Sequence, residues 1–157
     1  MKIRLVLVVL VATLAALVAA PADAHTNGRQ VGRSCVPVHA TGTGEETAPG
    51  QTTATIFVRG VEVGTTTASF TTTGVDGTVA SFVGPLVFTS AAGTLTAQLV
   101  GTLDTATGAF ASRSEEELTG TGIFARVQGR LTLRGTVDLS DGSFTERISG
   151  RLCFPRR

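Results

Sequence analysis

The residues best suited to chemistry are carboxylates that an alternating strand pattern turns toward apolar neighbours. Glu146 stands between Phe144 and Ile148, and alternate residues of a strand point to opposite faces, so this carboxylate is expected to face inward. A carboxyl group in an apolar interior has a raised pKa and can donate or accept a proton near neutral pH. Two further carboxylates share this inward parity and are candidate catalytic residues: Glu116, with Phe110 and Leu118, and Glu62, with Ile56 and Val58.

Each of these carboxylates has an alternative placement. It could stand at a strand end in water, or a β-bulge could reverse the side-chain parity. The run from Glu115 to Glu117 is more typical of a solvated strand than of a site. We therefore expect Glu146 to be the strongest candidate of the three.

Other kinds of catalytic centre find little support. The only histidines are His25 and His39. Cleavage after Ala24 would make His25 the first residue, and an N-terminal histidine can bind copper. We expect an ordinary terminus without a bound metal instead. No Gly-x-Ser-x-Gly elbow is present for a Ser-His-Asp triad. Lys2 is the only lysine, and tyrosine is absent. Beyond the N-terminal segment the chain therefore offers neither a Schiff base nor a Tyr general acid.

The elements that would position these carboxylates are short alternating segments separated by Gly- and Asp-rich turns, a pattern typical of an all-β barrel or sandwich. Residues 41–50 are expected to form a loop. Eight antiparallel strands at this spacing fit an up-and-down barrel, with an immunoglobulin-like sandwich as the alternative. The expected strands cover residues 31–40, 53–63, 65–73, 78–89, 94–103, 109–118, 123–139 and 144–154.

The same parity assigns an apolar lining to the barrel. On the late strands, leucines alternate with arginines, so Leu131 and Leu133 point inward while Arg130 and Arg134 point outward. A lumen of eight strands is just wide enough for side chains or one small ligand. The residues expected to line it and bind such a ligand are Val36, Val38, Leu95, Leu99, Phe110, Leu131, Leu133, Phe144 and Ile148.

The N-terminal segment is predicted to be a secretory signal peptide. Lys2 and Arg4 precede an apolar run from Leu5 to Ala20, and Ala22-Asp-Ala24 follows it. This arrangement indicates cleavage after Ala24 and secretion, whereas a membrane anchor would need about 17–25 apolar residues. We expect residues 1–24 to be the signal peptide, residues 25–157 to form a single β-barrel domain, and no stable membrane span to remain.

Cys35 and Cys153 are the only cysteines. In an exported protein such a pair indicates a disulfide, and a redox pair would be expected to have Cys-x-x-Cys spacing. A bond between two residues so far apart suggests that the first and last strands are neighbours. By parity, Cys153 lies on the outer wall and His39 also faces outward.

Charge and composition argue against nucleic acid as a partner. The chain carries 13 basic and 12 acidic side chains. Removal of Lys2, Arg4 and Asp23 with the leader leaves the two signs balanced. A neutral chain without basic clusters in its sequence, and without Tyr or Trp for base stacking, is a poor nucleic-acid binder.

One segment carries a family resemblance. Leu118–Leu133, and within it Gly120, Thr121, Gly122, Phe124 and Gly129, resembles the Gly-Thr/Ser-Gly-x-Phe segment of the allene oxide cyclase and dirigent barrel superfamily. Paired glycines allow a sharp return of the chain, and Phe124 is expected to plug one barrel end. A cysteine near each end of residues 25–157 is also similar to the arrangement in secreted dirigent proteins.

The resemblance implies an eight-stranded barrel, often trimeric, that works without a metal or organic cofactor. It implies a small hydrophobic molecule as partner, held in one conformation while it cyclises or isomerises. The motif is structural, so no catalytic residue is carried over from the family. The alternatives are a non-catalytic carrier barrel and a structural cell-surface module with a filled lumen.

Overall fold

The computed structural model describes residues 32–115 and 117–156, and most of them lie in strands. The predicted signal peptide and His25 fall outside these residues. Within them, no helix is long and apolar enough to cross a membrane. The elements are β1 (Arg33–Ala48), β2 (Gln51–Val58), β3 (Val61–Ser69), β4 (Thr71–Asp76), β5 (Val79–Ser90), β6 (Gly93–Asp104), β7 (Ala109–Ser114), β8 (Thr119–Gly120), the 3₁₀ helix η1 (Gly122–Phe124), β9 (Gln128–Val137) and β10 (Ser143–Pro155).

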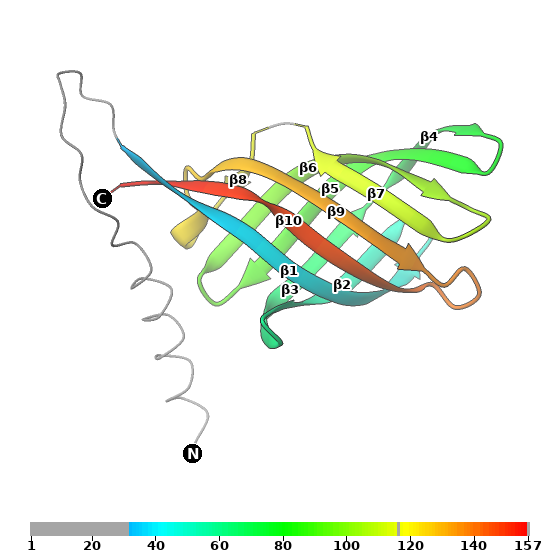
Figure 1. Cartoon of the computed structure of the whole chain (residues 1–157), viewed down its shortest axis with the longest axis horizontal. Helices are drawn as coiled ribbons and strands as arrows, with labels where there is room; N and C mark the ends of the chain where they lie inside the picture. Colours follow the sequence, from blue (N-terminus) through cyan, green and yellow to red (C-terminus); the bar gives the residue numbers. More distant parts are fainter. Residues whose placement is uncertain (1–31, 116, 157) are drawn as a thin grey trace, which may run out of the picture.

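The strands form one closed antiparallel barrel (Figure 1). Around the barrel the order is β1, β2, β3, β5, β6, β7, β9 and β10, and β10 pairs with β1 to close it. β4 continues the line of β3 beside β5, and β8 continues the line of β7 beside β6. The predicted eight-stranded barrel is therefore confirmed. The sandwich alternative is wrong because a single sheet closes on itself.

Several predicted boundaries are wrong. The strand expected over residues 65–73 is replaced by β3 and β4, and the strand expected over residues 109–118 ends at Ser114. Three further differences have a clear local cause. β1 runs through most of the expected loop, because Gly42 and Gly44 occupy inward positions of a continuous ladder with β10. β2 ends at Val58, and the two-residue turn Arg59–Gly60 takes positive φ at both positions, 53° and 79°, as a tight hairpin requires. The strand expected from residue 123 begins at Gln128, because η1 precedes it.

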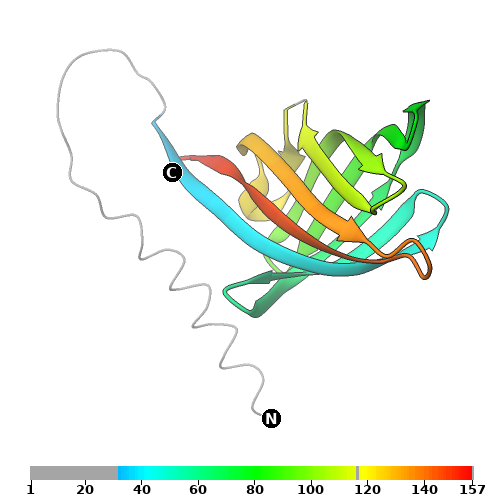
Figure 2. The ribbon, with the colours of Figure 1, turned by 45° about the vertical axis from the view of Figure 1, so that its right-hand side comes forward.

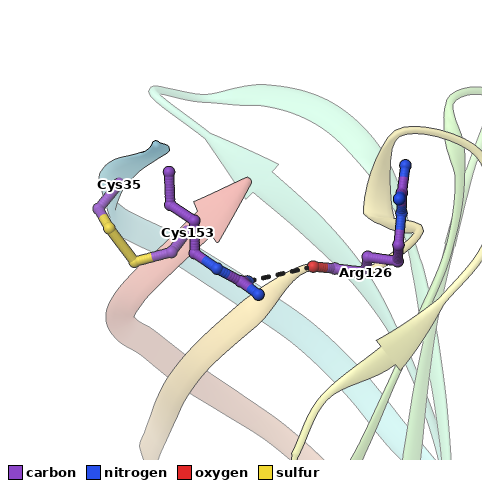
Figure 3. The surroundings of a disulfide bond; sticks show 4 residues. Cys35, Arg126 and Cys153 are labelled. Carbon is purple, nitrogen blue, oxygen red and sulfur yellow. Dashed lines mark hydrogen bonds between the residues drawn. A yellow bond between two sulfur atoms is a disulfide. The ribbon is translucent and has the colours of Figure 1, made fainter. Parts of the chain in front are cut away.

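The disulfide closes the seam between the first and last strands. Cys35 and Cys153 are directly opposite each other in the β1–β10 ladder, bonded across a sequence separation of 118 residues. Figure 3 shows the bond beside a hydrogen bond in which Arg33 Nη1 donates to the Arg126 carbonyl at 3.4 Å. The predicted pairing of the cysteines and of the two strands is thus confirmed.

The two ends of the barrel differ. At the end nearest the disulfide, Phe124 of η1 is buried and its ring lies 5.9 Å from that of Phe88 and 6.4 Å from that of Phe154. Val127, which follows η1, is 2% exposed. The prediction that Phe124 plugs the barrel is confirmed. The opposite end carries the β1–β2, β4–β5, β6–β7 and β9–β10 turns (Figure 2), and no comparable segment among the described residues crosses it.

Candidate functional site

A cavity of about 250 Å³ occupies the barrel at the end opposite the plug. Its walls include residues beside the β1–β2 and β9–β10 turns, so it opens to solvent there. Deeper in the barrel, side chains of the core fill the interior. The lining residues are Glu46, Gly50, Thr52, Thr66, Phe70, Thr72, Ala80, Phe82, Leu86, Leu103, Phe110, Ser112, Leu133, Val137, Gly142, Phe144 and Glu146.

Glu146 forms part of the floor of this cavity. It is only 6% exposed, and the next inward residue of β10, Ile148, belongs to the packed core. Its ladder partners on both sides are glycines, Gly42 on β1 and Gly135 on β9. Two cross-strand neighbours without side chains leave room for the carboxyl group on the inner face.

Burial changes the acidity of this carboxyl group. Desolvation raises the pKa of Glu146 from 4.5 to about 7, because the apolar surroundings disfavour the charged form. Among the described residues, no arginine or histidine lines the cavity to offset this effect. Near neutral pH the group therefore exists in both protonation states and can donate or accept a proton.

Hydroxyl groups and a second carboxylate add polarity to the walls. Thr66 and Ser112 are buried and line the cavity from β3 and β7. Glu46 stands at the mouth, where its Oε1 accepts a hydrogen bond from the Gly50 N–H at 2.7 Å. The Glu46 backbone N–H donates to the Gly142 carbonyl at 3.0 Å. The first bond lies within the β1–β2 hairpin, and the second connects this hairpin to the β9–β10 turn at the rim of the mouth.

Aromatic rings supply much of the apolar wall. The Phe110 and Phe144 rings meet edge to face with centroids 6.2 Å apart, and the Phe70 and Phe82 rings are 4.8 Å apart. Such pairs hold a defined surface because tilted and edge-on contacts are the preferred geometries of aromatic rings. The cavity is thus a mainly apolar chamber with a single carboxyl group on its floor.

The three predicted carboxylates have different outcomes. The inward orientation of Glu146 is confirmed, and its catalytic role stays a prediction. The inward orientation of Glu62 is wrong: the turn at residues 59–60 and a bulge that lets Phe57 pair with Glu62 break the expected parity, and Glu62 is exposed. Glu116 lies outside the described residues.

Three of the nine predicted ligand-binding residues reach the cavity: Phe110, Leu133 and Phe144. The others face the interior as expected but belong to the packing between the cavity and the plug, so they are not placed to touch a guest in the cavity. These six are Val36, Val38, Leu95, Leu99, Leu131 and Ile148. His39 is exposed on the outer face of β1, also as expected.

Several lining residues were not predicted. Ser112 has the same parity as Phe110, and this alone would have identified it as inward. Thr66 stands between Gly64 and Ala68, a pattern with no strong apolar signal. Phe70 and Phe82 had no assigned role, and Glu46 belonged to the expected loop. Their common position at one barrel end follows from the register between strands, which the sequence does not state.

The acidic residues of the turns bind backbone groups. Across the described part of the chain, no three His, Cys, Asp or Glu side chains are grouped to hold an ion. The aspartates in turns hold backbone groups instead: Asp104 accepts from the Ala106 N–H at 2.9 Å and Asp141 from the Ser143 N–H at 2.8 Å. They stabilise the hairpins, as turn aspartates commonly do.

Comparisons with known proteins identify the fold. No protein-family model and no curated protein matches the sequence. Among solved structures, the pterocarpan synthase dirigent protein PsPTS1 is 13% identical with a TM-score of 0.51, over 79% of this chain and 97% of that one. The pterocarpan synthase dirigent protein GePTS1 is 12% identical with the same TM-score, over 88% of this chain and 99% of that one. The chain therefore has the barrel fold of the dirigent proteins, as the Gly120–Gly129 segment predicted.

Proposed function

We propose that this barrel binds a small hydrophobic molecule in its open-ended cavity and steers an intramolecular cyclisation or isomerisation, with Glu146 moving the proton. The observation that carries the proposal is the buried carboxyl group of Glu146 on the floor of a mainly apolar cavity. A non-catalytic carrier would need the cavity but no such group. A structural module would need neither.

The proposed chemistry needs no cofactor. A carboxylate at Glu146 takes a proton from an activated carbon of the guest, and the resulting acid returns a proton at a different atom, so the guest is isomerised without net gain or loss. The apolar walls exclude water and restrict the guest to a conformation that can react. The hydroxyl groups of Thr66 and Ser112 provide hydrogen bonds that orient a guest oxygen.

The volume of the cavity limits the guest. A closed apolar cavity of about 150 Å³ accommodates benzene, and sites for drug-sized ligands start at about 300 Å³. A cavity of about 250 Å³ therefore fits a compact molecule of one or two rings. Because the cavity is open at the mouth, a longer substituent can extend past Glu46 into solvent.

Two further observations support the proposal. The two similar solved structures are named as synthases, which favours a synthetic role for this interior over a purely structural one. The disulfide Cys35–Cys153 is typical of an oxidising compartment, and we propose that the protein is secreted.

The test uses 2-tetralone, a two-ring ketone with acidic protons beside its carbonyl group. In D₂O, the wild-type protein should accelerate deuterium exchange at these protons above the buffer rate, and Glu146→Gln should abolish the acceleration. Binding of 2-tetralone, followed by saturation-transfer NMR, should persist in the variant. Removing a general base typically costs about 10²–10⁴-fold in rate.

The other outcomes contradict the proposal. Equal exchange rates for wild type and Glu146→Gln would remove Glu146 from the mechanism. Binding without any accelerated exchange in the wild type would favour the carrier. Absence of binding would favour the structural module.

A further inference from the structure

The outer wall of β9 and β10 carries four exposed arginines in two directly opposed pairs. In the β9–β10 ladder, Arg134 is the partner of Arg147 and Arg130 is the partner of Arg151. All four side chains are exposed. We call this surface the arginine face and define it by these four residues.

The row between the two pairs is uncharged but polar. Its centre is the ladder pair Thr132 and Ser149. His39 of β1 adjoins Ser149, and Arg113 of β7 adjoins Thr132. The arginine pairs are four residues apart along each strand, which corresponds to about 13 Å at the usual rise of a strand.

This arrangement is unfavourable unless something neutralises it. Like charges directly opposite each other in a sheet are destabilising. The residues that the flanking strands pair with these arginines include no carboxylate: they are Pro37 and Thr41 on β1 and Ala111 on β7. A carboxylate close to the face is Glu117, at a hollow beside Arg130 and Arg151. Within the described residues, the one ion pair joins Arg113 and Glu115 at 3.3 Å. None of the four arginines of the face takes part in it.

The face also has relief. A shallow hollow adjoins the Arg130–Arg151 pair, and Gln128 and Gly129 form part of its wall beside Cys153. Glu117 is the single carboxylate at this hollow. A flat charged surface would not distinguish partners by shape, whereas this hollow offers an amide and a backbone edge next to two guanidinium groups.

We propose that the arginine face binds a linear anionic polysaccharide that carries sulfate or phosphate groups. One anionic group lies between Arg134 and Arg147, and another lies between Arg130 and Arg151. Guanidinium groups bind such oxyanions through paired hydrogen bonds. The hydroxyl groups of Thr132 and Ser149 contact the uncharged sugar between them, and the hollow accommodates the adjoining ring.

Other polyanions fit the face less well. Single-stranded nucleic acid binds strongly where aromatic side chains stack on its bases, and the outward positions of β9 and β10 carry none. An anionic membrane is bound best by a basic surface that also inserts apolar or aromatic side chains, and the arginine face has neither. The convex wall of a barrel also touches a flat bilayer along only a narrow strip.

The test measures binding of the folded protein to heparin, used as the sulfated probe, at several salt concentrations. Arg134→Gln/Arg147→Gln and Arg130→Gln/Arg151→Gln should each weaken binding about tenfold or more, and each should reduce the salt slope by roughly two, about one per lost contact. The control Arg59→Gln/Arg126→Gln removes the same charge from two sites outside the face and should change affinity by less than about twofold.

Parallel measurements decide between this partner and its rivals. Neither face variant should unfold at a lower temperature than wild type, since each removes a repulsive pair, and both should still bind 2-tetralone. Equal weakening by the control variant, or no heparin binding at all, would overturn the proposal. Tighter binding to duplex or single-stranded DNA, or to phosphatidylserine vesicles, would also overturn it, as would full competition by free sulfate at matched ionic strength.

Discussion

Gly42 lies directly opposite Glu146 in the β1–β10 ladder, and the carboxyl group of Glu146 occupies the space that a side chain at Gly42 would take. A β-carbon on Gly42 would come within 2.7 Å of Glu146 Oε1 and 2.8 Å of its Cγ. The position of the acid on the cavity floor therefore depends on the absence of a single methyl group on the next strand.

Gly42→Ala should consequently displace the carboxyl group without removing it. We expect the exchange of 2-tetralone protons to slow while Glu146 remains titratable, with an apparent pKa shifted from that of the wild type. NMR titration of the Glu146 carboxyl carbon measures the shift. The matched control is Gly74→Ala, where no atom lies within 4 Å of the added carbon. Unchanged exchange in Gly42→Ala would contradict the positioning role.

The stability of the protein should depend on pH through Glu146. Its pKa is about 7 in the folded protein, against an ordinary value of 4.5 for a glutamate, so the folded state binds more protons between these two pH values. Stability is therefore greatest below about pH 4.5 for this group, declines as the pH rises toward 7, and is constant above it. The decline should be on the order of 3 kcal/mol.

Urea unfolding of wild type and Glu146→Gln from pH 4 to pH 8 measures this effect. Because glutamine does not titrate, the difference in unfolding free energy between the two proteins should change across this range in favour of the variant at high pH. A difference independent of pH would mean that the carboxyl group is solvated in the folded state.

Filling the cavity should block the guest. Thr66 faces the cavity and the adjacent Thr67 faces solvent, so Thr66→Leu and Thr67→Leu add the same side chain to opposite faces of one strand. Thr66→Leu should weaken binding of 2-tetralone roughly tenfold or more. The leucine takes space that the guest would fill, and losing the burial of an apolar group of side-chain size costs about 1.5 kcal/mol or more of binding free energy. Calorimetry should show little change for Thr67→Leu. Comparable losses in both would place the binding site elsewhere.

Removing the disulfide should lower stability without changing the fold. A crosslink over 118 residues restricts the unfolded chain by about 5 kcal/mol in the chain-entropy account. Cys35→Ala/Cys153→Ala should reduce the free energy of unfolding by up to this amount, measured in urea, while the circular dichroism of the folded state is unchanged. Wild type under reducing conditions should match the variant. A loss below about 1 kcal/mol would show that the β1–β10 ladder alone holds the seam.

The sequence predicts local features of this fold well where one signal acts alone. Strict alternation along β10 placed Glu146 inward correctly, and the glycines before Phe124 indicated the plug. Prediction failed where two effects compete. Glu62 had the right parity for the interior, but the chain turns at Arg59 and bulges beyond it. Gly42 and Gly44 suggested a loop because glycine is common in turns. In the barrel they instead leave room for side chains on the neighbouring strand.

The register between neighbouring strands could not be predicted from the sequence, for a different reason. The alternating pattern predicted the outward face of Arg130, Arg134, Arg147 and Arg151. Only the register of the β9–β10 ladder shows that they lie opposite each other in pairs. The absence of basic clusters along the sequence was one ground for excluding nucleic acid as a partner. The fold makes such a cluster from two adjacent strands, so that exclusion now depends on the balanced net charge and the lack of aromatic platforms.

Because Phe124 closes one end of the barrel, the cavity has a single opening, at the other end. A molecule that enters past Glu46 meets Glu146 with its leading end and has to back out the way it came. The end of the guest that enters first is therefore the end that reaches Glu146. A second molecule can enter only after the first has left. In the proposed reaction, the shape of the cavity would therefore fix which part of the guest meets the acid before any bond changes.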